Sequence, residues 1–138
     1  MIILDTNVLS EMMKATPNNA VRNWINRQDA AALYITSITL SESLFGIAIL
    51  PTGKRRDALS ITLNGLLNIF AGKILPFGET AARCYAELAA QAQAAGKTLP
   101  PADGYIAAIA AAHRFVVASR DTAPFQAAGV DVINPWQG

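Results

Sequence analysis

Residues 1–14 have the sequence MIILDTNVLSEMMK, and this stretch carries the strongest indication of the fold. Three apolar, β-prone residues run directly into Asp5, and the polar pair Thr6-Asn7 precedes an amphipathic segment that extends to about Lys14. The pattern predicts a short buried strand followed by a helix. A carboxylate at the end of a buried strand has two explanations: Asp5 caps the helix, or it belongs to a functional site.

Strand and helix patterns alternate along the rest of the chain. Further strands are predicted over residues 32–37 (ALYITS), 73–77 (KILPF), 115–119 (FVVAS) and 130–135 (VDVINP). Helices are predicted over residues 17–29, 39–50, 54–72, 79–96 and 102–114, and a turn over residues 120–125 (RDTAPF). Either Thr39 or Ser41 is expected to open the helix over residues 39–50.

This alternation predicts an α/β fold. Strands separated by helices imply right-handed crossovers and a central, mainly parallel sheet of four to five strands with helices on both faces. No repeat or linker divides the chain, so we expect a single domain over residues 1–138. In such sheets ligands bind outside the carboxyl ends of the strands, where Asp5 lies and which Asp121 closely follows.

Composition and charge argue against several classes of protein. Lys and Arg number 11 against 10 Asp and Glu, so no overall basic field points to nucleic acid. Cys84 and His113, each the only residue of its type, provide neither an internal disulfide nor a Cys/His zinc site. No apolar run approaches the roughly 20 residues of a membrane span, and no basic segment with a cleavage site is present. We expect a cytoplasmic protein without a membrane partner.

The apolar content is slightly high for a soluble domain. Hydrophobic residues make up 52% of the chain and the mean hydropathy is +0.29, whereas soluble domains contain roughly 45 to 50%. We therefore expect that some apolar surface on the helices is buried against another subunit.

Glu42 stands out among the acids because of its neighbours at helical spacing. On a helix it shares a face with Ile38, Phe45 and Ile49, which predicts a buried carboxylate. Such a group needs a cation, a network of donors or a proton. Pairing with an Arg, or a subunit contact, would also accommodate it. Six other acids lie among polar neighbours or near element ends, where solvent suffices: Glu11, Asp29, Asp57, Glu79, Glu87 and Asp131.

Three further acids fit a shared site. Asp103 lies on the side of a core helix that carries Ile106 and Ala110, although it could also be an N-cap. Asp5 and Asp121 follow strands, so all four acids can converge on one edge of the sheet. Carboxylates in such a cluster repel one another and persist mainly around a hard divalent cation, here Mg²⁺ or Mn²⁺ because no Cys/His set exists. Sites of this kind hydrolyse phosphodiesters.

Four blocks of the sequence resemble the PIN-domain toxins of the VapC type, most closely their FitB-like members. The blocks are residues 2–11 (IILDTNVLSE), 37–47 (SITLSESLFGI), 100–113 (PPADGYIAAIAAAH) and 116–136 (VVASRDTAPFQAAGVDVINPW). The resemblance covers most of the chain, with residues 52–75 the least diagnostic part. It implies a three-layer α-β-α PIN-like domain.

The resemblance also implies roles for individual residues. Asp5, Glu42 and Asp103 match the metal-site acids of the family, and Asp121 matches a fourth acid of the FitB-like form. Thr6, Asn7 and Ser119 match positions that support the site. Many relatives have Thr-Arg-Asn and then Asp-Phe where this chain has SRDTAPF. The difference leaves open whether Asp121 touches a metal or only holds a water.

The activity implied by the resemblance is that of a Mg²⁺- or Mn²⁺-dependent endoribonuclease, the toxin of a type II toxin–antitoxin pair. Such proteins form homodimers, are inhibited by a cognate antitoxin and reach operator DNA only through it. The basic run Lys54, Arg55 and Arg56 could contact RNA phosphates, or could be a solvated helix start.

Two alternatives remain open. A catalytically silent PIN-fold dimer would act mainly as the partner of a DNA-binding antitoxin. A haloacid-dehalogenase-like phosphatase also begins with a strand and a nucleophilic Asp, but it needs a second acid where this chain has Asn7.

Overall fold

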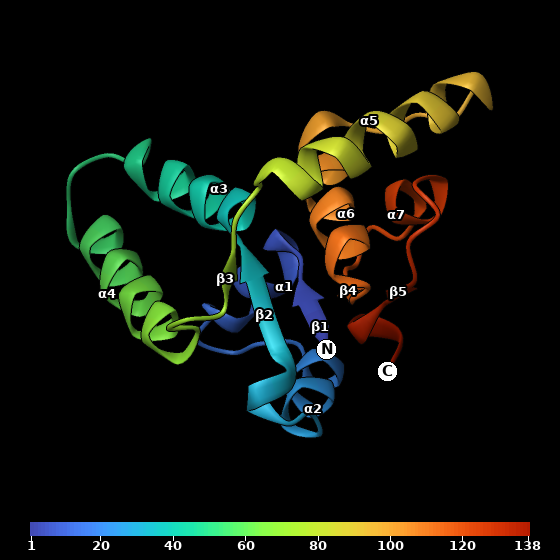
Figure 1. Cartoon of the computed structure of the whole chain (residues 1–138). Helices are drawn as coiled ribbons and strands as arrows, with labels where there is room; N and C mark the ends of the chain where they lie inside the picture. The colour runs from blue at the N-terminus through green and yellow to red at the C-terminus, as the bar shows by residue number, and fades with distance from the viewer.

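The computed structural model describes residues 1–138 and contains a parallel five-stranded sheet covered by helices (Figure 1). The strands are β1 (Ile2–Leu4), β2 (Leu33–Thr36), β3 (Ile74–Leu75), β4 (Val116–Ala118) and β5 (Val132–Ile133). The helices are α1 (Thr6–Met12), α2 (Asn19–Asn26), α3 (Ser37–Ala48), α4 (Lys54–Ile69), α5 (Glu79–Ala94), α6 (Pro101–His113) and α7 (Ala123–Ala127), with 3₁₀ turns η1 (Ala30–Ala32) and η2 (Pro135–Gln137). The predicted α/β fold is confirmed.

The strand order is β3-β2-β1-β4-β5, so the direction of winding reverses at β1. The chain first moves outward from β1 to β2 and β3, and then returns to place β4 and β5 on the other side. β1 and β4 pair in parallel, with Ile3 opposite Val117. Crevices between strands at such a reversal are where ligands bind in open α/β sheets. The carboxyl ends of β1 and β4 therefore define the candidate site.

Side chains alternate between the two faces of the sheet, and each face has its own core. Ile3 and Val117 pack with Phe125 and residues of α5 and α6 on one face. Leu4 and Ala118 pack on the other face with residues of α1, α2 and α4. Burial on both faces is typical of parallel sheets and gives the three-layer arrangement that was expected.

Polar side chains at the strand ends start two of the helices. Asp5 Oδ1 accepts a hydrogen bond from the Thr6 N–H (2.8 Å) and so caps α1. Thr36 ends β2 and caps α3, because its Oγ1 accepts from the Thr39 N–H (3.1 Å). The prediction that Thr39 or Ser41 opens this helix is wrong, because the buried hydroxyl of Thr36 already serves the first turn.

Residues 123–127 form the short helix α7, where the sequence predicted only a turn over residues 120–125. Pro124 lies in the first turn of this helix, a position that needs no backbone N–H donor. Phe125 is fully buried in the core beside α6. Tertiary packing of one aromatic residue thus stabilises a helix too short for its local sequence to reveal.

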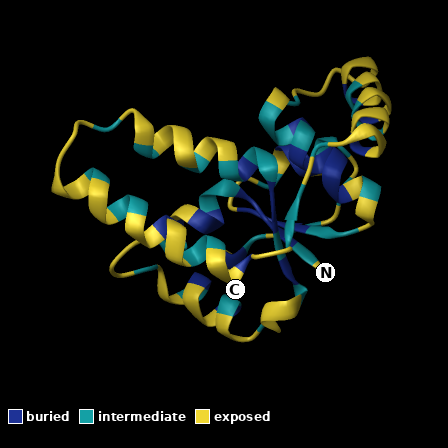
Figure 2. Cartoon of the chain, turned by 60° about the vertical axis from the view of Figure 1, so that its left-hand side comes forward, coloured by how far each residue is buried: buried dark blue, intermediate teal, exposed yellow.

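Helices α3 and α4 extend away from the sheet, and we refer to residues 37–69 as the α3–α4 arm (Figure 1). Much of its surface is exposed (Figure 2). Five large apolar side chains on the arm are solvent-exposed, namely Leu44, Phe45, Ile49, Ile61 and Ile69. The excess apolar content of the sequence thus lies partly on this arm. No helix of the chain combines the length and hydropathy needed to cross a membrane.

Helices α5 and α6 approach each other closely at Gly104, the residue after Asp103. A Cβ atom at Gly104 would lie 2.9 Å from Tyr85 Cε1 and 3.4 Å from Leu99 Cδ2. The Tyr85 ring cannot move aside freely, because it packs against the ring of Tyr105 with centroids 4.8 Å apart. The absence of a side chain at Gly104 therefore sets how α5 lies against the first turn of α6.

We predict that Gly104→Ala destabilises the protein by about 1–3 kcal/mol, the usual cost of overpacking a core. The matched control is Gly65→Ala in α4, where a Cβ meets nothing within 4 Å. That substitution should stabilise the helix by about 0.5–1 kcal/mol. Urea unfolding of both variants measures the difference. Equal stability of the two variants would contradict the close approach of α5 and α6.

Candidate active site

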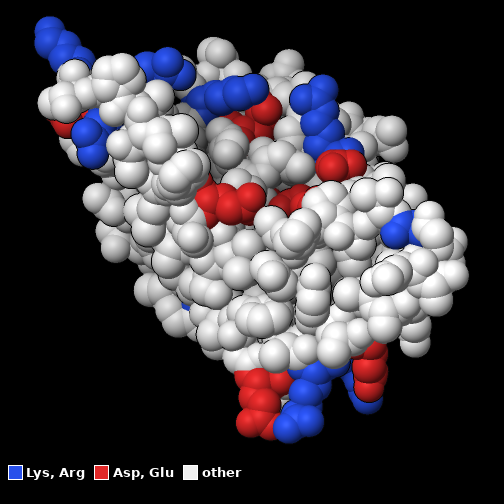
Figure 3. Space-filling model, turned by 90° about the horizontal axis from the view of Figure 1, so that it is seen from above, with Lys and Arg blue, Asp and Glu red and all other residues white.

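A pocket of about 450 Å³ lies at the carboxyl edge of the sheet, at the reversal point between β1 and β4. Its lining residues are Asp5, Thr6, Asn7, Ser10, Glu11, Lys14, Glu42, Asp103, Arg120 and Trp136. Seen from above, acidic side chains gather in a hollow of the surface, with Lys and Arg side chains around it (Figure 3). Asp5, Glu42 and Asp103 thus share one pocket, as the sequence predicted.

Asp5 is buried, with 4% of its surface exposed, and both of its carboxylate oxygens are engaged. Oδ1 caps α1, whereas Oδ2 accepts from Ser119 Oγ (2.7 Å) and from Asn7 Nδ2 (3.5 Å). Burial raises the pKa of Asp5, and the charges of Glu42 and Asp121 raise it further, against hydrogen bonds from Ser119 and Thr6 that lower it. The helix cap therefore accounts for Oδ1 of Asp5 but not for Oδ2, which belongs to the hydrogen bonds of the site.

Ser119 and Asn7 connect the ends of the two central strands. Ser119 Oγ, directly after β4, donates to Asp5 and accepts from Asn7 Nδ2 (3.1 Å) and from the Asp121 N–H (3.0 Å). The Oδ1 atom of Asn7 accepts from the Arg120 N–H (3.2 Å). These bonds hold the turn after β4 against the start of α1 and orient Asp5.

Glu42 is exposed, so the prediction of a buried carboxylate at this position is wrong. Its neighbours on the same face, Phe45 and Ile49, are also exposed, at 65% and 66%. The apolar stripe with Phe45 and Ile49 faces solvent because α3 meets the core through other side chains, Thr39 in its first turn and Ile47 near its end. Glu42 nevertheless borders the pocket, and its Oε1 accepts from Thr6 Oγ1 (2.6 Å).

Asp103 lies in the first turn of α6 and is half-buried. It is not the N-cap, because Pro100 occupies that position and no side chain caps this helix. Burial, and to a smaller extent the charges of Asp5, Asp121 and Glu42, raise the pKa of Asp103 to about 6. The negative charges of the site therefore act on one another.

Asp121 lies at the rim of the acidic pocket. Its carboxylate is exposed and lines a neighbouring cavity with Pro100 and Pro124. Its charge still reaches the site, because it raises the pKa of both Asp5 and Asp103. Asp121 thus lies near the three other acids but lines a different cavity.

The donor set suits a hard cation, although no three carboxylates form a preformed metal cluster. The available ligands are carboxylate oxygens, which Mg²⁺ and Mn²⁺ prefer. Ser119 and Asn7 supply the outer hydrogen bonds that orient such ligands. Burial, and to a smaller extent the neighbouring acids, raise the pKa of Asp103, and a cation would offset both effects.

Five residues that line the pocket were not assigned to the site from the sequence: Ser10, Glu11, Lys14, Arg120 and Trp136. The guanidinium of Arg120 lies over the Trp136 ring, 5.3 Å from its centroid, and forms no ion pair. Glu11 was expected in solvent but is only 6% exposed, and it accepts from the Asn18 N–H and Lys14 Nζ, both at 3.0 Å. These bonds lower the pKa of Glu11. The sequence did contain one indication that Glu11 belongs to the site. Helical spacing places Glu11 on the same face as Asn7 and Lys14.

The basic run is divided between different environments. Lys54 begins α4 and is exposed, which matches the solvated helix start. Arg55 lines a cavity of about 250 Å³ that shares Thr6 and Glu42 with the acidic pocket. Arg56 lines a separate cavity on the arm. Of the three, Arg55 alone borders a cavity that adjoins the acids.

We predict that Asp103→Asn stabilises the metal-free protein at pH 7. The folded pKa of about 6 exceeds the ordinary value of 3.8, so the wild type loses stability as pH rises between these values. The gain should therefore shrink from pH 7 to pH 5, as wild-type Asp103 becomes protonated. Glu11 has the opposite effect on stability, because its pKa is lowered in the folded protein. The stability that it contributes is lost only as the pH falls below about 4.5, the ordinary pKa of this side chain.

Urea unfolding in EDTA at several pH values measures this effect. The control is Asp131→Asn, at an exposed position whose carboxylate makes no ion pair. A variant at position 103 no more stable than wild type at pH 7 would show that burial and the neighbouring charges do not raise the pKa of Asp103 as described.

Comparison with known proteins agrees with this geometry. The family model described as PIN domain matches residues 2–130. The chain is 54% identical to VapC ribonuclease Y4jK of Sinorhizobium fredii over 138 residues, covering 99% of each chain. It is 44% identical to Toxin FitB of Neisseria gonorrhoeae over 137 residues, again covering 99% of each.

Solved structures give the same result. The crystal structure of FitAcB from Neisseria gonorrhoeae superposes with a TM-score of 0.95 at 44% identity and covers 100% of both chains. The structure of FitAB bound to an IR36 DNA fragment gives a TM-score of 0.93 over 99% of this chain and 96% of that one. The chain therefore belongs to the PIN-domain family, among relatives that include VapC ribonuclease and the toxin FitB.

Proposed function

We propose that this protein is a metal-dependent endoribonuclease that acts as the toxin of a toxin–antitoxin pair. The observation that carries the proposal is the pocket at the β1–β4 reversal, lined by Asp5, Glu42 and Asp103 with Asp121 at its rim. Relatives named VapC ribonuclease and Toxin FitB, similar over nearly the whole chain, support it.

In this proposal the acids Asp5, Glu42, Asp103 and Asp121 hold Mg²⁺ or Mn²⁺. When bound, such an ion would supply an activated water and would stabilise charge on the scissile phosphate. Asp5 is held in place by Ser119 and Asn7. Glu42 is exposed and free to turn toward an ion. Thr6, which donates to Glu42, competes with the ion for that carboxylate.

Other chemistries find less support among the side chains of the pocket. It contains no Cys or His, and the ring of His113 packs against Phe115 (5.2 Å) at the end of α6. Asn7 stands where a phosphatase of the haloacid-dehalogenase type needs an acid, and its amide is committed to Ser119 and to the Arg120 N–H. Hydrolysis by an activated water requires no protein nucleophile.

Arg120 is suited to contact an RNA phosphate. Its guanidinium is held over the Trp136 ring at the edge of the acidic pocket and forms no direct ion pair, although its charge helps to lower the pKa of Glu11. A planar guanidinium recognises phosphate through paired hydrogen bonds. Arg55, beyond Glu42 in the adjoining cavity, offers a second contact on the other side of the acids.

The α3–α4 arm is the proposed interface with protein partners. Its exposed apolar side chains, Phe45 and Ile49 among them, belong in an interface rather than in solvent. We propose that the chain forms a homodimer and binds a cognate antitoxin, which carries the complex to operator DNA. The DNA-bound FitAB structure supports this arrangement.

We predict that Asp5→Asn abolishes RNA cleavage and leaves the fold intact. The single oxygen of Asn can still cap α1, and the Ser119 hydroxyl can donate to the Asp121 carbonyl (3.2 Å) in place of the lost carboxylate oxygen, but the variant lacks the charge that would hold the cation. Purified wild type and variant, free of antitoxin, are incubated with single-stranded RNA in Mg²⁺ or Mn²⁺ and in EDTA. Circular dichroism checks the fold, and Asp131→Asn is the matched control.

Cleavage that needs the metal and Asp5 separates the nuclease from the catalytically silent dimer. Wild-type protein that binds an antitoxin but leaves RNA intact in both metals would favour the silent dimer. Full activity of Asp5→Asn would mean that the wrong acid has been assigned to the site.

A further inference from the structure

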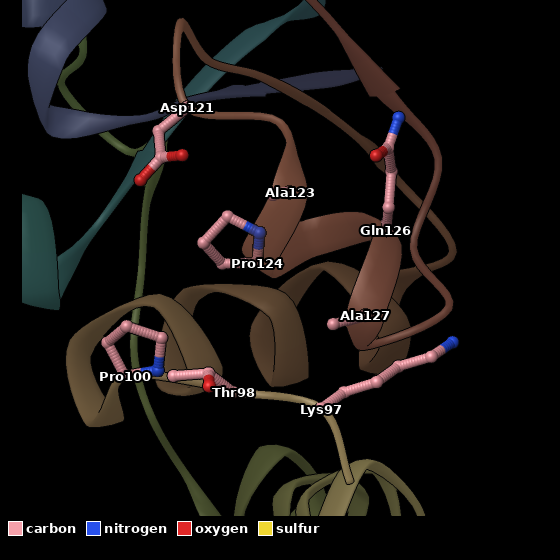
Figure 4. Close-up of a pocket in the computed structure, with 8 residues that line it drawn as sticks. All are labelled: Lys97, Thr98, Pro100, Asp121, Ala123, Pro124, Gln126 and Ala127. Atoms are coloured by element: carbon pink, nitrogen blue, oxygen red, sulfur yellow. The ribbon is translucent and has the colours of Figure 1, made fainter. Parts of the chain in front are cut away.

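A second cavity, of about 560 Å³, lies beside the acidic pocket. The connection from α5 to α6 forms one wall, with Lys97, Thr98 and Pro100, and the segment from Asp121 through α7 forms the other (Figure 4). The rings of Pro100 and Pro124 lie on the Asp121 side, whereas Lys97 and Gln126 lie on the far side. We refer to it as the Lys97–Gln126 pocket.

The backbone fixes both walls of the Lys97–Gln126 pocket. Gly96 ends α5 in the left-handed conformation (φ +70°), and the Lys97 N–H donates to the Ala92 carbonyl (2.9 Å), which completes a Schellman cap. On the other wall, buried Phe125 anchors α7 against the core. The pocket is thus held in place by capped and packed elements.

The pocket adjoins the acids along both walls. Asp121 belongs to the turn whose backbone N–H bonds to Ser119, and Ser119 in turn holds Asp5. Pro100 directly precedes α6, whose first turn carries Asp103. A polymer with one phosphate at the acids therefore meets this pocket with its neighbouring residue.

The lining has the chemistry of a nucleotide site. The exposed ring of Pro100 and the alanines of α7 give apolar surface beside four polar side chains, and the volume lies within the range of about 300 to 1,000 Å³ that is typical of sites for organic ligands. The Gln126 amide can both donate to and accept from a base edge. Lys97 is exposed and forms no ion pair, so its charge is available to a phosphate.

We propose that the Lys97–Gln126 pocket binds the nucleotide adjacent to the scissile phosphate of a single-stranded RNA. The base lies against the exposed ring of Pro100 with its edge toward Gln126, and the next phosphate contacts Lys97. This inference rests on the proposed nuclease function and adds to it a subsite that reads one base beside the cut. Arg55 and the Lys97–Gln126 pocket then lie on opposite sides of the acids.

The first test measures binding and does not depend on cleavage. In the Asp5→Asn background, anisotropy of a labelled single-stranded RNA gives the affinity at several salt concentrations. Lys97→Gln should lower the slope of log K against log salt by about 0.7, the value for one phosphate contact on a single strand. The control Lys73→Gln makes the same charge change beside Ala30, at the amino ends of the strands.

The second test measures cleavage by the otherwise wild-type protein. Gln126→Ala should relax the base preference at one position beside the cut and raise KM several-fold with kcat unchanged, because Gln126 does not touch the reacting atoms. Gln91→Ala, at an exposed position on α5, is the control. Sequencing of the cleaved ends reads the preference.

The outcomes separate this inference from the proposed function. An inactive wild type would contradict the nuclease, and the salt slope would still decide the RNA contact. A slope for Lys97→Gln equal to that of Lys73→Gln would overturn the subsite. The subsite would also be overturned if both pocket variants kept normal RNA binding and base preference but bound an antitoxin more weakly. The pocket would then be a binding site for the antitoxin.

Discussion

Carboxylates that lie close together repel one another, and this chain holds several at a single edge of its sheet. Asp5 ends β1, Asp103 starts α6, Glu42 projects from α3, and Asp121 follows β4. Burial is the main cause that raises the pKa of Asp103 to about 6, and the charges of the three other acids raise it further. The fold withstands the repulsion because Asp5, the most buried of the four, receives hydrogen bonds from Thr6, Asn7 and Ser119.

The bond from Ser119 to Asp5 has a particular place in this arrangement, because it joins the ends of two strands that are adjacent in space and distant in sequence. Strand order brings β1 and β4 together, and their cores on both faces hold the register. The site is thus a consequence of topology: when the winding direction reverses at β1, the polar residues after both strands must meet. The two other acids, Glu42 on α3 and Asp103 on α6, come from helices outside the β1–β4 pair.

Much of this could be predicted from the sequence, because it follows from local patterns. Apolar runs that end in polar residues located the strands, and their alternation with helices gave the parallel sheet and the edge where Asp5 and Asp121 lie. Glu42 shows the limit of the method. Its apolar neighbours Phe45 and Ile49 indicated burial, but helical spacing cannot distinguish a face that meets the core from one left open for a partner.

The remaining features depend on contacts between distant segments. Helix α7 forms because Phe125 packs in the core. Glu11 is buried because the chain returns after α1, so that the Asn18 N–H donates to the Glu11 carboxylate. The position of Arg120 over Trp136 joins the turn after β4 to the C-terminal η2 turn. The cavity between Lys97 and Gln126 likewise has no counterpart in any single stretch of sequence, because its walls come from α5–α6 and α7.

The central claim is that the four acids form a cation site. The most direct measurement is the thermal unfolding of the antitoxin-free protein, stripped with EDTA and titrated with MnCl₂. A cation that binds only the folded chain adds about 2.7 kcal/mol of stability at a hundred times its Kd, a rise in Tm on the order of 10 °C for a chain of this size. The account predicts a saturable rise that Asp5→Asn removes. A Tm that stays constant across millimolar Mn²⁺ and Mg²⁺ would contradict it.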